Sequence, residues 1–215
     1  MNNKNIPIAI LYCILAVLSI PFLILLIVHI FLFGNVYHKI CFLILGISIF
    51  LYTLFNTLSH WIVINSNTPK PLRKLALLSS SLLISAILLC YSFSTLSGVS
   101  KWIMFGLVSL FFMYNELFFS IWTNIPFFLA EIFKDTNYII FIIFLPNIIH
   151  FFIEKNLTLL FVLSTLASFI LIIISSVFKY IYAKKKPLYL YTISKVLILC
   201  SLIIQVLNLL FTIPR

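Results

Sequence analysis

Apolar stretches of about 20 residues recur along the whole chain, and short polar segments separate them. A helix of that length crosses roughly 30 Å of hydrocarbon. Because backbone groups in lipid must be hydrogen-bonded within their own segment, we expect these stretches to be helices. Strands of a membrane barrel would alternate, and runs such as 139–145 and 166–174 do not. The pattern predicts an all-α fold: a polytopic transmembrane helical bundle of about seven spans, forming one integral membrane domain over residues 1–215.

The polar segments set the bounds of the predicted spans. These spans cover residues 7–33, 40–64, 75–96, 102–133, 138–152, 157–178 and 188–213. Span 102–133 is long enough to tilt, to kink at Pro126 or to project into water. Span 138–152 is the shortest and is interrupted by Pro146, so it is either a full crossing or a re-entrant segment. Two prolines are expected to keep the polar segment 65–74 out of a helix.

Composition and charge indicate the environment and the orientation. Of the 215 residues, 64% are hydrophobic and only 8% are charged, whereas soluble domains carry about a quarter charged residues. The net charge of +10 comes from bases spread among the polar segments, without the stacking aromatics of a nucleic-acid surface, so no nucleic-acid partner is expected. With seven spans, most bases fall on the side of the N-terminus, which the positive-inside rule assigns to the cytoplasm. The predicted cytoplasmic bases include Lys70, Arg73, Lys74, Lys184, Lys185 and Lys186.

Ionisable residues within the spans are the first candidates for a functional site. The stretch 115–135 holds three of the four carboxylates of the chain. Glu116 falls near the midpoint of span 102–133, and an ionisable group at that depth suggests a function. It could pair with Lys195 of the last span, or be protonated and bonded to Asn115 or Ser120. A proton or ligand site is the alternative.

Histidines raise the alternative of an intramembrane metallohydrolase. His29, His38 and His150 are predicted to share the non-cytoplasmic side, but no two of them share a helix turn and no acid is placed beside all three. We therefore interpret these histidines as residues at the membrane–water interface. No metal, cofactor or catalytic residue is expected. His60 ends a polar patch with Asn56 that we expect to serve packing. The four cysteines show no C-x-x-C pairing and are read as small buried apolar residues.

The segment from Leu117 to Lys134 resembles one family, the plant tobamovirus multiplication proteins and the related orphan seven-helix receptors of lysosomal membranes. The residues that carry this resemblance are Leu117, Phe118, Phe119, Ser120, Thr123, Ala130, Glu131, Ile132 and Phe133. Segments 10–17, 53–60 and 176–187 are similar in kind to other spans of the family, whereas 75–96 has no counterpart there. The resemblance implies a vacuolar or lysosomal membrane protein that acts through cytoplasmic partners, including small GTPases, and not an enzyme.

Three functions therefore stay open on the sequence. The leading one is a multi-pass membrane protein, receptor-like or scaffold-like, whose cytoplasmic segments 65–74, 134–137 and 179–187 contact protein partners. The second is a small transporter or proton-coupled carrier that uses Glu116 and Lys195. The third is the intramembrane metallohydrolase.

Overall fold

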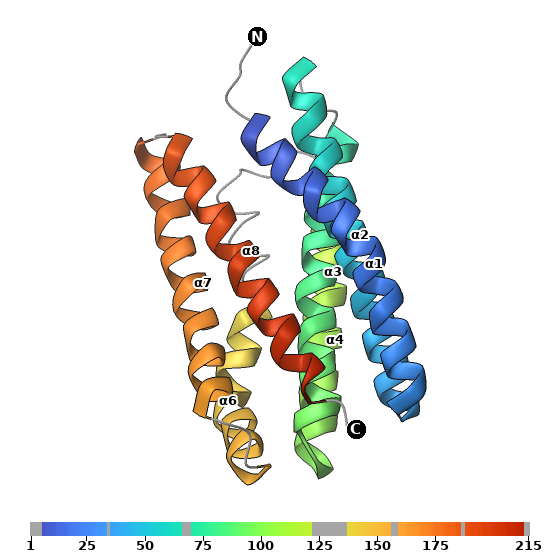
Figure 1. Cartoon of the computed structure of the whole chain (residues 1–215). Helices are drawn as coiled ribbons and strands as arrows, with labels where there is room; N and C mark the ends of the chain where they lie inside the picture. Colours follow the sequence, from blue (N-terminus) through green and yellow to red (C-terminus); the bar gives the residue numbers. More distant parts are fainter. Residues whose placement is uncertain are drawn as a thin grey trace.

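The computed structural model describes residues 6–33, 35–65, 70–121, 137–155, 159–185 and 188–212. The helices in these ranges are α1 (Ile6–Phe33), α2 (Val36–Asn65), α3 (Lys70–Thr95), α4 (Gly98–Ile121), α6 (Asn137–Glu154), α7 (Leu159–Lys185) and α8 (Leu188–Leu210). They lie roughly side by side in one bundle, with the beginning of α1 and the end of α8 at opposite ends (Figure 1). The described residues contain no strand, and the predicted all-α bundle is confirmed.

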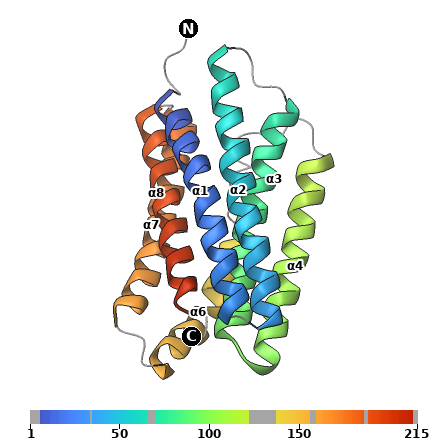
Figure 2. The same cartoon turned by 45° about the vertical axis from the view of Figure 1, so that its right-hand side comes forward.

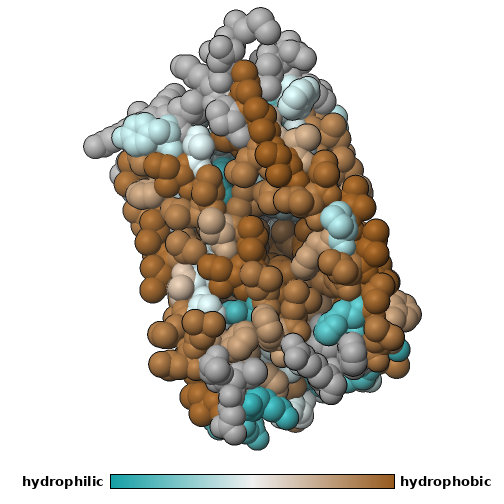
Figure 3. Space-filling model, viewed as in Figure 1, coloured by the Kyte–Doolittle hydropathy of each residue, from teal (hydrophilic) through white to brown (hydrophobic). Residues whose placement is uncertain are grey.

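Six of the helices are long and apolar enough to cross a membrane, and α6 is shorter. The outer face is mostly hydrophobic, with polar residues gathered toward the two ends (Figure 3). A surface of this kind is stable in lipid and not in water. The chain is thus an integral, multi-pass membrane protein.

Two helical hairpins flank a central helix. The α1–α2 and α7–α8 pairs have the most extensive helix contacts in the described residues. Between them, α3 packs against α2, α4, α6 and α8, while α4 lies on the far side of α3 from α8 (Figures 1 and 2). Consistent with this central place, 72% of the most apolar stretch of α3 is buried inside the protein, compared with 17% for α1.

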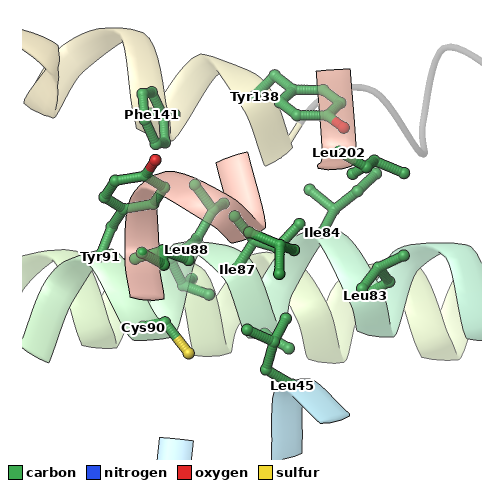
Figure 4. Close-up of a cluster of buried hydrophobic side chains, with 14 of the residues drawn as sticks. Leu45, Leu83, Ile84, Ile87, Leu88, Cys90, Tyr91, Tyr138, Phe141 and Leu202 are labelled. Atoms are coloured by element: carbon green, nitrogen blue, oxygen red, sulfur yellow. The ribbon is translucent and has the colours of Figure 1, made fainter. Parts of the chain in front are cut away.

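The core forms where α3 meets α2, α6 and α8. Figure 4 shows Leu83, Ile87 and Tyr91 of α3 within the cluster of buried side chains that fills this region. The rings of Tyr91 and Phe141 meet edge to face, with their centroids 4.8 Å apart. Because lipid is as apolar as these side chains, the close fit between them stabilises the bundle more than burial itself does.

Polar side chains join α7 to α8. Asn208 donates from Nδ2 to Thr165 Oγ1 at 3.0 Å and accepts at Oδ1 from the Ser164 hydroxyl, also at 3.0 Å. The Ser201 hydroxyl donates to the Ser168 carbonyl at 2.9 Å. Small hydroxyl residues let the two backbones approach closely, so this seam holds the hairpin by packing and hydrogen bonding together.

The α3–α4 hairpin turns at the other end of the bundle from the first residue of α1. Gly98 has φ of +58°, a left-handed conformation that favours glycine. The Ser92 hydroxyl donates to the carbonyl of Lys101 at 2.8 Å. The Lys101 ammonium lies over the rings of Phe93 and Trp102, 5.7 and 5.4 Å from their centroids. These contacts fix how α3 and α4 leave the turn.

Two polar segments expected to be loops are largely helical. Helix α3 begins at Lys70, five residues earlier than a loop over 65–74 allows, because proline is tolerated in a first helical turn, where Pro71 lies. Helix α7 continues to Lys185, so most of the expected loop 179–187 is helix as well. The prediction of a loop was wrong for residues 70–74 and 179–185, and residues 66–69, 186 and 187 lie outside the described residues.

The two uncertain spans also differ from expectation. Pro146 lies inside α6, which continues through it, so the expected interruption was wrong. Helices in membranes tolerate proline because neighbouring groups satisfy the freed backbone carbonyl. Helix α4 is described as far as Ile121. The remainder of the predicted span 102–133, including Pro126, and residues 134–136 of the expected loop 134–137 lie outside the described residues.

Replacing Asn208 by Leu is expected to weaken the α7–α8 seam, because it removes both hydrogen bonds of the amide. Interhelical hydrogen bonds in membrane proteins contribute about 0.6 kcal/mol each on average, so the apparent melting temperature in detergent should fall by a few degrees. Leu207→Val, a change at an exposed neighbour, should leave it unchanged. In a double-mutant cycle, strictly additive effects of Asn208→Leu and Thr165→Val would contradict the contact between these side chains.

Candidate functional site

Glu116 and Lys195 lie in different parts of the bundle. Glu116 is on α4, which packs against α3 and α6, whereas Lys195 is on α8, which packs against α7 and α3. Lys195 interacts electrostatically with Tyr12 of α1 and His60 of α2. Since α3 stands between α4 and α8 (Figure 2), the structure does not bring together the two residues that the sequence suggested as a pair.

A buried polar cluster gathers instead where α1, α2 and α8 approach one another. The hydroxyls of Tyr12 and Tyr52 share a hydrogen bond of 3.1 Å. The Tyr12 ring stacks on the His60 imidazole, with centroids 5.5 Å apart. Lys195 is 8% exposed, and its ammonium lies 5.3 Å from the centroid of the Tyr191 ring. We call Tyr12, Tyr52, His60 and Lys195 the tyrosine–histidine cluster.

Helical spacing explains how α2 contributes to this cluster. Tyr52, Asn56 and His60 are four residues apart and therefore share one face of the helix. The Asn56 side chain donates to the Tyr52 carbonyl at 2.8 Å and so is satisfied within its own helix. The sequence pointed to His60 and Asn56 but missed Tyr12 and Tyr52. Tyr52 could have been found from its spacing of four residues before Asn56, which places both on one helix face. Tyr12 has no signal in the sequence beyond a polar hydroxyl within an apolar span.

A small pocket lies beside the cluster, between the two hairpins. It is narrow and partly open, and Tyr52 belongs to both the pocket and the cluster. The residues that line it come from α2, α3, α6 and α8: Tyr52, Ser80, Leu83, Ile84, Tyr138, Ile198 and Leu202. A hollow between α8 and α3 is visible on this face of the protein (Figure 3). Apolar walls with a few polar groups are typical of ligand sites.

The polar residues expected on span 102–133 have distinct positions on α4. Asn115 is fully buried, and neither of its side-chain polar atoms has a hydrogen-bond partner among the residues that the structure describes. Glu116 is partly buried, and its Oε1 is buried without a partner. Its predicted place near the midpoint of span 102–133 stays a prediction, because residues 122–133 lie outside the described residues. Ser120 is exposed, and its backbone carbonyl accepts a hydrogen bond from the Lys74 ammonium at 2.8 Å.

The family-like motif lies only partly within the described residues. Leu117 is exposed, Phe118 is intermediate and Phe119 is fully buried, so these three residues present different sides of α4 to their surroundings. Thr123, Ala130 and Glu131 lie outside the described residues.

The predicted cytoplasmic bases cluster at the end of the bundle where α1 begins. Lys70 starts α3, and Arg73 and Lys74 follow within its first turns. Lys184 and Lys185 are the last residues of α7, and Lys186 lies just beyond the described range. These helix termini lie at the same end of the bundle, on opposite sides of it at the top of Figure 1. Lys179, expected in the loop, is instead buried within α7.

Histidines and cysteines do not assemble into a site in the described part of the chain. No group of three His, Cys, Asp or Glu side chains there could hold a metal ion. His38 shares a 2.6 Å hydrogen bond with Asn35, and His150 Nδ1 lies 3.9 Å from Glu154 Oε2, the contact their spacing predicts. All four cysteines are free; Cys41 and Cys90 are buried as expected, whereas Cys13 and Cys200 are exposed on lipid-facing helix surfaces.

No family model, curated protein or solved structure matches this chain. The resemblance to the tobamovirus multiplication proteins therefore stays a prediction, and function has to be argued from the site itself.

Replacing Tyr12 by Phe is expected to destabilise the protein by about 1 kcal/mol, because it removes the Tyr12 hydroxyl and with it the buried hydrogen bond to Tyr52. The apparent melting temperature in detergent should fall by about 2–4 °C. Tyr189→Phe is the matched control, since Tyr189 is 66% exposed. If Tyr12→Phe melted at the wild-type temperature while Tyr52→Phe melted lower, the bond between the two hydroxyls would not be the interaction that matters.

Proposed function

We propose that this chain is a non-catalytic, receptor-like membrane protein that takes up part of a lipid-derived ligand into the pocket between its hairpins. The observation that supports the proposal is the pocket itself, which lies between α2 and α8, two helices without extensive contact with each other. Its walls are mainly apolar, and the end of a hydrocarbon chain entering from the bilayer would widen it by displacing a side chain such as that of Tyr52.

Tyr52 provides a route from the pocket to the basic end of the bundle. It lines the pocket and bonds through its hydroxyl to Tyr12, which in turn stacks on His60. A ligand that displaces the Tyr52 ring would therefore act on the contact between α1 and α2. Both helices have a terminus at the end where the bases gather, so a change in their packing alters the surface offered to partners there.

The bases at that end support a cytoplasmic, partner-binding role. Arg73 is exposed and Lys74 is partly exposed at the start of α3, and clustered bases near a membrane surface also attract anionic headgroups. The family resemblance adds an expectation of protein partners such as small GTPases, at a vacuolar or lysosomal membrane.

A proton-coupled carrier is the second candidate. Its support is the buried Oε1 of Glu116, which has no hydrogen-bond partner, because an ionisable group of this kind can load and release a proton. Lys195 would have no direct part in that chemistry, since α3 separates it from Glu116.

Filling the pocket should block ligand uptake. Leu83→Trp adds bulk to the pocket wall and should abolish crosslinking of a photoactivatable acyl chain, supplied on a phospholipid in vesicles, to the peptide that contains residues 80–84 of α3. Peptide mapping by mass spectrometry is the measurement.

The control is Leu110→Trp, the same change at a position of α4 that is 65% exposed. It should leave labelling of residues 80–84 unchanged. Equal labelling of the wild type and Leu83→Trp would overturn the pocket as a ligand site.

A fluorescent tag on the N-terminus should face the cytoplasm and mark a vacuolar or lysosomal membrane, because the bases gather at the end where α1 begins. Protease added to permeabilised cells with intact organelles should remove the tag. A protected tag would reverse the orientation, and a surface or endoplasmic-reticulum signal would argue against the family resemblance.

A further inference from the structure

Buried polar atoms without partners concentrate on the facing sides of α3 and α4. Within the described part of the chain, both polar atoms of the Asn115 side chain, Oε1 of Glu116 and the hydroxyl of Ser81 on α3 have no hydrogen-bond partner. Asn115 and Ser81 are both 0% exposed. A buried polar group left unpaired costs roughly 1–3 kcal/mol, and native proteins retain few of them without a water, an ion or a function to account for them.

Two contacts set the register between the helices. Lys74 near the start of α3 bonds to the Ser120 carbonyl near the end of α4, and Ser92 near the end of α3 bonds to the Lys101 carbonyl. The helices therefore run antiparallel, and Asn115 falls within about one turn of Ser81 along the bundle.

Helical periodicity directs these side chains toward each other. Ser81 lies seven residues after Lys74, so it shares the face of α3 that contacts α4. On α4, Asn115 belongs to a buried stripe with Met104, Val108 and Phe119. Helix α4 packs mainly on α3, so this stripe is the one that faces Ser81.

We propose that Ser81, Asn115 and Glu116 form a binding site for a monovalent cation of the Na⁺ type. The Glu116 carboxylate, the Asn115 carboxamide oxygen and the Ser81 hydroxyl are hard oxygen ligands, which alkali and alkaline-earth cations prefer over the nitrogen and sulfur ligands of transition metals. One carboxylate balances one positive charge, so a singly charged ion leaves the least net charge in the membrane. Water or backbone carbonyls complete its coordination.

The surroundings allow such an ion. Among the described bases, Lys74 lies near in register, but its ammonium bonds to the Ser120 carbonyl, one turn beyond Glu116 on α4. The inference does not rest on the receptor-like proposal, because its residues do not line the pocket.

The test is thermal unfolding of the purified full chain in detergent, with NaCl or KCl replacing choline chloride at constant ionic strength. The apparent melting temperature of the wild type should rise and saturate with Na⁺ or K⁺, because an ion that binds only the folded state stabilises it. No rise with either ion would overturn the proposal. A pH-dependent melting temperature without an ion effect would also overturn it, since Glu116 would then hold a proton in place of the cation.

Single-residue variants assign the effect to the site. Ser81→Ala should need about tenfold or more Na⁺ for half of the shift, and Asn115→Leu and Glu116→Gln should lose the shift. The matched control is Ser79→Ala: the Ser79 hydroxyl is also buried on α3 but already donates to the Ala76 carbonyl at 3.0 Å. An unchanged ion response in Ser81→Ala and Glu116→Gln, both conservative enough to fold, would contradict the assignment.

Discussion

The bundle depends on α3, a helix that is buried on most sides and yet rich in serine. It contacts α2, α4, α6 and α8, and α1 and α7 reach the core mainly through α2 and α8. Serines at 79, 80 and 81 are buried within it. Small side chains let the four neighbouring helices approach the α3 backbone closely. Lipid chains cannot pack against that backbone as closely as these helices do. A larger residue at these positions would separate α3 from its neighbours, and the two hairpins would lose their common support.

Polar groups at membrane depth have no water to satisfy them, and the protein resolves this in two ways. Along α2, Thr53 and Thr57 donate to carbonyls one turn earlier in the same helix. Between α7 and α8, hydroxyls and amides bond across the seam. The unpaired atoms of Asn115 and Glu116 on α4 stand out because neither solution applies to them. In a membrane such a departure points to an occupant of the site more strongly than it would in a soluble protein.

Most of the fold could be predicted from the sequence, because the length of an apolar stretch alone decides whether it can cross a bilayer. The first and last spans begin or end within a few residues of α1 and α8. The predicted helix boundaries were wrong where a helix continues through prolines and bases beyond its apolar stretch, as at Pro71 and Lys185. Hydropathy identifies the residues that lie in the membrane, but it does not identify where the helix ends. The site was harder to predict. Which faces meet depends on helix rotation and order, so the sequence paired Glu116 with Lys195, while the structure places α3 between their helices.

The pocket and the cation site share α3, and adjacent serines belong to each. Ser80 lines the pocket, whereas the seven-residue spacing of Ser81 from Lys74, which bonds to α4, directs Ser81 toward α4. A ligand that shifts or rotates α3 would change the distance from Ser81 to Asn115 and hence the affinity for the ion. Thermodynamic linkage requires the converse: an ion that fixes α3 against α4 changes the affinity for the ligand by the same factor. Close-packed helices transmit such shifts because they have few intermediate arrangements. A receptor-like role and an ion site are thus compatible in one bundle, with α3 as the element that both would move.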